Sequence, residues 1–174
     1  MRPLLRHSLD SFYGLLMALA ALAMAASFVC VMLGIADRQF ALGLRGLDAY
    51  AGYAVAAALF LALPGTLQKG EHIRVTLLLQ RVPAAWRTAL EWGCLIGGTA
   101  LSAMLAFYAV RLVWLSWLTH DVSPASDATP LWVPQLAMAL GCIGLAVGLL
   151  DSALSRLSGI RFELNAGAEA AHVE

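Results

Sequence analysis

The residues that could do chemistry gather at one point in the sequence, directly after an apolar stretch that ends at Gln68. A lysine, a glutamate, a histidine and an arginine follow in close succession: Lys69, Glu71, His72 and Arg74. Two further candidates stand alone, Asp48 before the same apolar stretch and Arg111 within a later one. Because interfacial basic residues often serve only as membrane anchors, we interpret these six as candidate contacts to a partner protein or to lipid.

Catalytic and cofactor-binding motifs are missing from the sequence. The four histidines, which haem ligation would need inside the membrane, all stand outside the apolar stretches: His7, His72, His120 and His172. The three cysteines are single residues in apolar surroundings, and we interpret them as small apolar residues: Cys30, Cys94 and Cys142. No zinc, phosphate-loop or nucleophile motif occurs. We therefore predict no enzyme activity, no cofactor and no metal.

Charges that could carry an ion or a proton across a membrane are also missing. The acids nearest the apolar stretches stand at their edges: Asp48, Glu91 and Asp151. Arg111 precedes Leu118 by seven residues, so it lies within ~10 Å of its helix end and could snorkel to headgroups or pair with an acid of another subunit. Only Pro64-Gly65 interrupts an apolar stretch, whereas secondary transporters usually have paired broken helices. We expect that the chain does not carry a solute unaided.

Apolar helices must position these residues, since the 174-residue chain is 61% hydrophobic and only 13% charged, against about 25% charged in soluble domains. Four nearly uncharged stretches reach the length of about 20 residues that a membrane-spanning helix needs: 11–36, 49–68, 92–118 and 131–150. The first is too long for a cleaved signal peptide. We predict an all-α integral membrane protein with four transmembrane helices in one domain, 1–164, followed by a flexible tail, 165–174.

The distribution of lysine and arginine predicts the orientation of these spans. Eight stand before the first span, between the second and third, or after the fourth: Arg2, Arg6, Lys69, Arg74, Arg81, Arg87, Arg156 and Arg161. The other two loops hold only Arg38 and Arg45. Basic residues near spans are retained in the cytoplasm, so both termini should lie there. The formal net charge of zero gives no basic field that would attract nucleic acid.

The loop between the second and third spans has a pattern of its own. Apolar residues recur in it at the spacing of one helical face: Val75, Leu78, Leu79 and Val82. With its basic neighbours, this stripe predicts a short interfacial amphipathic helix over 73–82 in the inner headgroup plane. Pro83 should end that helix, and a new helix should begin near Ala84 and continue into the third span.

Glycines four residues apart allow helix backbones to approach each other closely in a membrane. Two such pairs occur, Gly93 with Gly97 in the third stretch and Gly144 with Gly148 in the fourth. Packing within the four helices would explain them, and contact with another protein would explain them equally well.

Two segments give the sequence a family resemblance. Gly70-Glu-His-Ile-Arg-Val75, which leads into leucine-rich amphipathic sequence, and Asp48-Ala-Tyr50 before the second span resemble the small membrane subunit of tripartite ATP-independent periplasmic (TRAP) transporters. Thr129-Pro-Leu-Trp-Val-Pro134 is similar to the start of that family's fourth helix. The sequence departs from the pattern at Asp48, where two adjacent acids are often found, and at Thr76, where an acid is common.

The resemblance implies a complex in the bacterial inner membrane. A large, many-helix subunit would carry the solute and ion sites, and a periplasmic solute-binding protein would deliver a small organic acid. The small subunit would brace the stationary scaffold of the large one within the phospholipid bilayer. In that arrangement the charged cluster at 69–74 would lie at the inner interface.

Three other hypotheses remain open from the sequence. The small subunit of a tricarboxylate-type tripartite transporter would have a similar architecture and similar partners. A stand-alone four-helix transporter would need a charged residue at mid-depth, which the spans lack. A membrane redox subunit would need haem ligands inside the spans.

Overall fold

Four long helices make up the part of the chain that the computed structural model describes, residues 3–68, 84–125 and 128–157. They are α1 (Pro3–Phe40), α2 (Leu47–Gln68), α4 (Ala84–Leu118) and α5 (Trp132–Leu157). Each contains a segment long and apolar enough to cross a membrane: Leu9–Phe40, Leu47–Gln68, Trp92–Leu118 and Trp132–Ser155. The predicted all-α fold with four membrane-spanning helices is confirmed, and a helix does begin at Ala84. The predicted interfacial helix over 73–82 lies outside the described residues.

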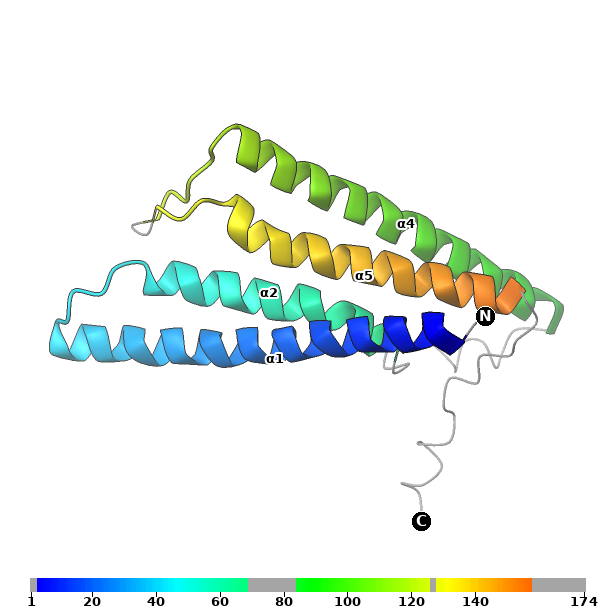
Figure 1. The fold of residues 1–174 in the computed structure, drawn as a ribbon, viewed down its shortest axis with the longest axis horizontal. Coiled ribbons are helices and arrows are strands. Elements are labelled where there is room, and N and C mark those ends of the chain that lie inside the picture. Colours follow the sequence, from blue (N-terminus) through cyan, green and yellow to red (C-terminus); the bar gives the residue numbers. More distant parts are fainter. Residues whose placement is uncertain (1–2, 69–83, 126–127, 158–174) are drawn as a thin grey trace, which may run out of the picture.

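The helices lie side by side in a row whose order differs from their order in the chain. Among the described residues, α1 packs on α2, α2 packs on α5, and α5 packs on α4, as Figure 1 shows. Two antiparallel hairpins are thus joined through α2 and α5. We call the end where α1 begins and α5 ends the terminal end, and the opposite end, with the 41–46 and 119–131 loops, the loop end.

A small apolar cluster holds together the two helices of each hairpin. Leu16 and Ala20 of α1 pack with Leu61 of α2. Ala109 of α4 packs with Ala139 and Cys142 of α5. Cys142 is fully buried, which agrees with its interpretation as a small apolar residue. These clusters are small: in the apolar 18-residue window of each spanning segment, no more than 22% of the residues are buried within the chain.

The loop between α1 and α2 is shaped by residues with left-handed backbone conformation. Ala41 follows the last residue of α1 with a φ of 50°, and Gly43 and Gly46 have φ values of 75° and 81°. Glycine adopts this conformation without the steric cost that a Cβ imposes. The carboxylate of Asp37 accepts a hydrogen bond from the Leu44 amide at 2.9 Å. The turn is therefore fixed at its middle by a side chain of the preceding helix.

Helix α2 does not break at Pro64-Gly65, so the expected interruption is wrong. The helix continues through Pro64 to Gln68. Proline lacks the N–H that would bond to the carbonyl of Phe60 one turn earlier, but its ring is fully buried. The Pro64 Cγ lies 2.6 Å from where a Cβ on Gly144 of α5 would stand. Packing of the ring against a glycine offsets the missing hydrogen bond.

Glycines on α5 allow it to approach α2, as the Gly144 and Gly148 pair predicts. A Cβ at Gly148 would lie 3.0 Å from Leu67 Cδ2. A Cβ at Gly141 would collide with the backbone carbonyl of Phe60. The pair on α4 behaves differently: a Cβ at Gly93 or Gly97 would meet no described atom within 4 Å. Packing within the described helices therefore explains the Gly144 and Gly148 pair, but it does not explain the Gly93 and Gly97 pair.

Candidate functional site

The structure describes two of the six predicted contact residues. Asp48 stands in the first turn of α2, and Arg111 stands on α4. Lys69, Glu71, His72 and Arg74 lie outside the described residues. The structure does not bring Asp48 and Arg111 together, because their helices, α2 and α4, are not neighbours in the row.

Asp48 forms an ion pair with Arg38 across the loop between α1 and α2. The Arg38 Nη2 lies 3.2 Å from Oδ2 and 3.5 Å from Oδ1 of the carboxylate. Both side chains are largely exposed, at 74% for Arg38 and 86% for Asp48, so solvent screens the pair. The negative charge of Asp48 in the first turn also interacts favourably with the positive end of the dipole of α2. Asp48 therefore has a local role in closing the loop.

The ion pair borders a hollow at the loop end. Its volume is about 420 Å³, and its lining includes Asp37, Arg38, Arg45 and Asp48, with Ala125 of the second loop on its border. The two basic and two acidic side chains balance in charge. The hollow therefore has no net charge that would select an anion or a cation.

Arg111 is exposed on α4 between aromatic side chains. Tyr108 is 54% exposed and Trp114 is 64% exposed. Among the described residues, the ion pair between Arg38 and Asp48 is the one salt bridge, so Arg111 has no acidic partner in that part of the chain. The two sequence interpretations of Arg111, snorkelling and pairing with another subunit, are both compatible with this position.

Hydrogen bonds tie the loop between α4 and α5 to helix α2. The Tyr53 hydroxyl donates to Ser123 Oγ at 2.7 Å. Thr129 Oγ1 donates to the Tyr50 hydroxyl at 3.2 Å. Within the loop, the Ser123 amide donates to the Thr129 carbonyl at 2.8 Å. This contact was not predicted from the sequence, although Tyr50 and Tyr53 are one helical turn apart and therefore share a face of α2.

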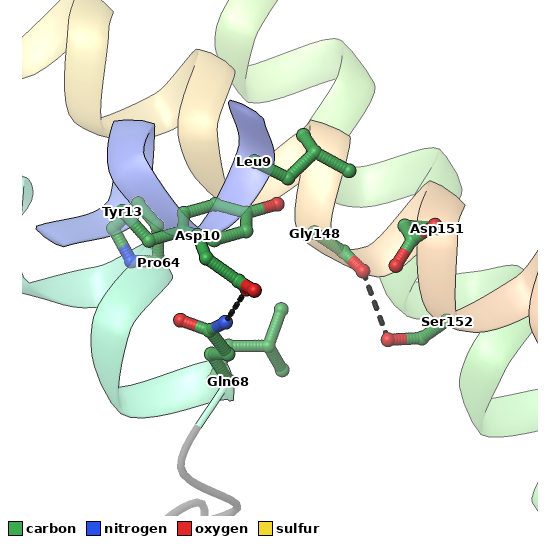
Figure 2. A pocket seen from close by; sticks show the side chains of 9 residues that line it. Leu9, Asp10, Tyr13, Pro64, Gln68, Gly148, Asp151 and Ser152 are labelled. Carbon is green, nitrogen blue, oxygen red and sulfur yellow. Dashed lines mark hydrogen bonds between the residues drawn. The ribbon is translucent and has the colours of Figure 1, made fainter. Parts of the chain in front are cut away.

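A polar pocket lies at the terminal end between α1, α2 and α5. Its volume is about 180 Å³, and its polar lining comprises Asp10, Tyr13, Gln68, Asp151 and Ser152. In Figure 2, Asp10 and Tyr13 stand on one side and Asp151 and Ser152 on the other. Gln68 Nε2 donates to Asp10 Oδ1 at 2.6 Å. From the sequence, Asp151 was placed at a span edge and Asp10 had no predicted role. In the structure both acids lie at the terminal end, Asp10 near the start of α1 and Asp151 near the end of α5.

The described side chains contain no candidate metal centre. No three His, Cys, Asp or Glu side chains of the described ranges gather in a way that could hold a metal ion. The cysteines are all free, and they differ in environment: Cys94 is exposed, Cys30 half-buried and Cys142 buried. Cys30 lies on α1, Cys94 on α4 and Cys142 on α5.

The four apolar helices define the chain as a multi-pass helical membrane protein. The family model described as "Tripartite ATP-independent periplasmic transporters, DctQ component" matches residues 27–159. The match begins within α1 and covers α2, α4 and α5 completely. The chain therefore belongs to the DctQ family, the small permease component of TRAP transporters. Comparison with curated proteins and with solved structures gave no match.

Proposed function

We propose that this chain braces the large membrane subunit of a TRAP transporter during ion-coupled uptake of a small organic acid, which a periplasmic solute-binding protein delivers. The observation that carries the proposal is the open row of helices. Large apolar side chains stay exposed along all four helices, for example Leu22 at 67%, Leu59 at 61%, Leu101 at 65% and Leu150 at 51%. Such surfaces must be covered by lipid or by another protein.

The orientation belongs to the same proposal. Eight basic residues stand before the first span, between the second and third spans, or after the fourth, and two stand in the loop between the first and second spans. Basic residues near spans stay in the cytoplasm. Both termini therefore lie in the cytoplasm of a bacterial cell, the chain crosses the inner membrane four times, and the loop end faces the periplasm.

The charged residues have a supporting role in this proposal. Lys69, Glu71, His72 and Arg74 follow directly on the terminal end of α2, at the level of the cytoplasmic headgroups. They contact the large subunit or anionic lipid there. Asp48 fixes the loop on the opposite side, and Arg111 contacts lipid headgroups or an acid of the large subunit.

Reconstitution with single components omitted tests the proposal. Proteoliposomes that hold this chain and the large subunit, with the solute-binding protein outside, should take up solute when an ion gradient is applied. Liposomes that hold this chain alone should take up none, because its described spans offer no charged site at mid-depth. Uptake by this chain alone would instead support the stand-alone transporter hypothesis.

The membrane redox hypothesis is tested on the same purified material. An absorption spectrum of the complex should show no haem band, since the described spans contain no histidine to act as an axial ligand. A haem band that stays with the chain through purification would support the redox hypothesis.

A further inference from the structure

The polar pocket at the terminal end carries negative charge from two different helices. Asp10 belongs to α1 and Asp151 to α5, and both line the same cavity of about 180 Å³. Asp10 accepts a hydrogen bond from the neutral amide of Gln68 at 2.6 Å. Asp151 is half-buried. Among the side chains that the structure describes, which do not include those of Arg6 and Arg156, the one salt bridge lies at the opposite end of the molecule. None of the described side chains therefore supplies a counter-charge to either carboxylate.

Tyr13 provides the second, independent observation. Its side chain is 5% exposed, and its hydroxyl has no hydrogen-bond partner among the described residues. The hydroxyl lies beside Gly148 across the pocket, 3.3 Å from where a Cβ on that glycine would stand, and Figure 2 shows it directed into the space between the two acids. Leaving a buried hydroxyl unsatisfied costs stability. The pocket is therefore incomplete without a further polar group.

The donors and acceptors of the lining specify the chemistry of that group. Ionised carboxylates only accept hydrogen bonds, and a phenol hydroxyl can accept one while it donates another. A single group that satisfies both acids and the hydroxyl at once would carry positive charge and several N–H donors. A metal ion fits less well, because the described residues offer no cluster of three His, Cys, Asp or Glu ligands. A guanidinium, whose planar fork of donors suits interfaces with carboxylates, fits best.

We propose that this pocket receives an arginine or lysine side chain of the large membrane subunit. The inference rests on the proposed function, because the family shown by residues 27–159 is one component of a multi-component transporter. The cavity has room for the end of one side chain. Gln68 orients the Asp10 carboxylate through its hydrogen bond, and Tyr13 and Asp151 line the same cavity, so the contact fixes the position of the partner at the terminal end.

The test uses the chain in its complex with the large subunit, with Asp10→Asn and Asp151→Asn combined. Asparagine keeps the size of the side chain and removes its charge. The amount of large subunit retained on the immobilised small subunit after a moderate salt wash should fall by roughly tenfold, as loss of a charged interfacial contact predicts. Asp121→Asn is the matched control: it changes an exposed acid at the loop end and should leave retention unchanged.

A stability measurement separates this role from a structural one. The isolated double variant should unfold at the same temperature as the wild-type chain or higher, because two like charges that line one cavity have been neutralised. A lowered unfolding temperature together with lost retention would show that the acids stabilise this chain itself, and would overturn the proposal.

The remaining outcomes distinguish the sources of the cation. Wild-type complex from cells that lack phosphatidylethanolamine should keep its large subunit; loss there would assign the pocket to a lipid amine and overturn the proposal. Neutralisation of Arg6, Lys69 or Arg156 should not reproduce the effect of the double variant; if one of them does, the cation comes from this chain and the proposal is overturned. If wild-type chain retains the large subunit and the double variant retains it equally, this inference alone fails. If even the wild-type chain retains none, the proposed function fails.

Discussion

The backbone carbonyl of Phe60 on α2 faces Gly141 on α5 so closely that a Cβ at position 141 would overlap it. The carbonyl is available because Pro64, one turn later, has no N–H to donate to it. A glycine Cα–H can make a weak hydrogen bond to such a carbonyl. Pro64 on α2 leaves the carbonyl free, and Gly141 on α5 allows the close approach to it. The two residues together make a contact that joins the two hairpins.

The substitution Gly141→Ala tests this contact. A methyl group at this position forces α2 and α5 apart, and overpacking of this kind costs about 1–3 kcal/mol. The unfolding temperature of the purified chain in detergent should fall. The control is Gly52→Ala on α2, where a Cβ would meet nothing within 4 Å; it should be neutral or stabilising by up to about 1 kcal/mol. Equal behaviour of the two variants would contradict the contact.

The hydrogen bond from Tyr53 to Ser123 should hold the loop between α4 and α5 on α2. In Tyr53→Phe that 2.7 Å bond is lost, at a cost of about 1 kcal/mol. Hydrogen exchange at the Ser123 amide, which bonds to Thr129, should become faster. Tyr108→Phe removes an exposed hydroxyl on α4 and serves as the control. Unchanged exchange in the Tyr53 variant would mean that the loop is held by its own backbone bonds.

The ion pair between Arg38 and Asp48 should contribute little to stability. A double-mutant cycle with Arg38→Ala and Asp48→Asn is expected to give a coupling energy below about 1 kcal/mol, because both partners are largely exposed. The coupling should shrink further at high salt. A coupling of several kcal/mol that persists in salt would show that the pair is shielded from solvent.

Arg111→Leu should leave the stability of the isolated chain unchanged, since Arg111 has no acidic partner among the described residues. Assembly with the large subunit should also be retained if the side chain snorkels to headgroups, which is the outcome we expect. The yield of complex from cells that express both subunits measures this. A sharp loss of complex would favour an ion pair with the large subunit.

The existence of the helices could be predicted from sequence, but their arrangement could not. Length and apolar composition decide whether a segment crosses a bilayer. Both are local properties, and they can be read directly from a stretch such as 92–118. The continuation of α2 through Pro64 depends instead on a glycine of α5, 80 residues later. No local pattern contains that information.

The pocket at the terminal end was missed for the same reason. Asp10 and Asp151 are unremarkable as single acids at span edges, and they become a site only because α1 and α5 meet beside Tyr13. The glycine pairs show the same limit. Gly144 and Gly148 pack within the chain, whereas Gly93 and Gly97 meet no described atom, although both pairs have identical spacing.

Formation of a complex with the large subunit tests the central claim most directly. The chain and the large subunit of the same transporter should be co-expressed, extracted in mild detergent and analysed by native mass spectrometry. The account predicts a complex that contains both subunits and that survives removal of most lipid. Recovery of this chain only as itself or as a self-sufficient oligomer, with the large subunit intact and separate, would contradict the account.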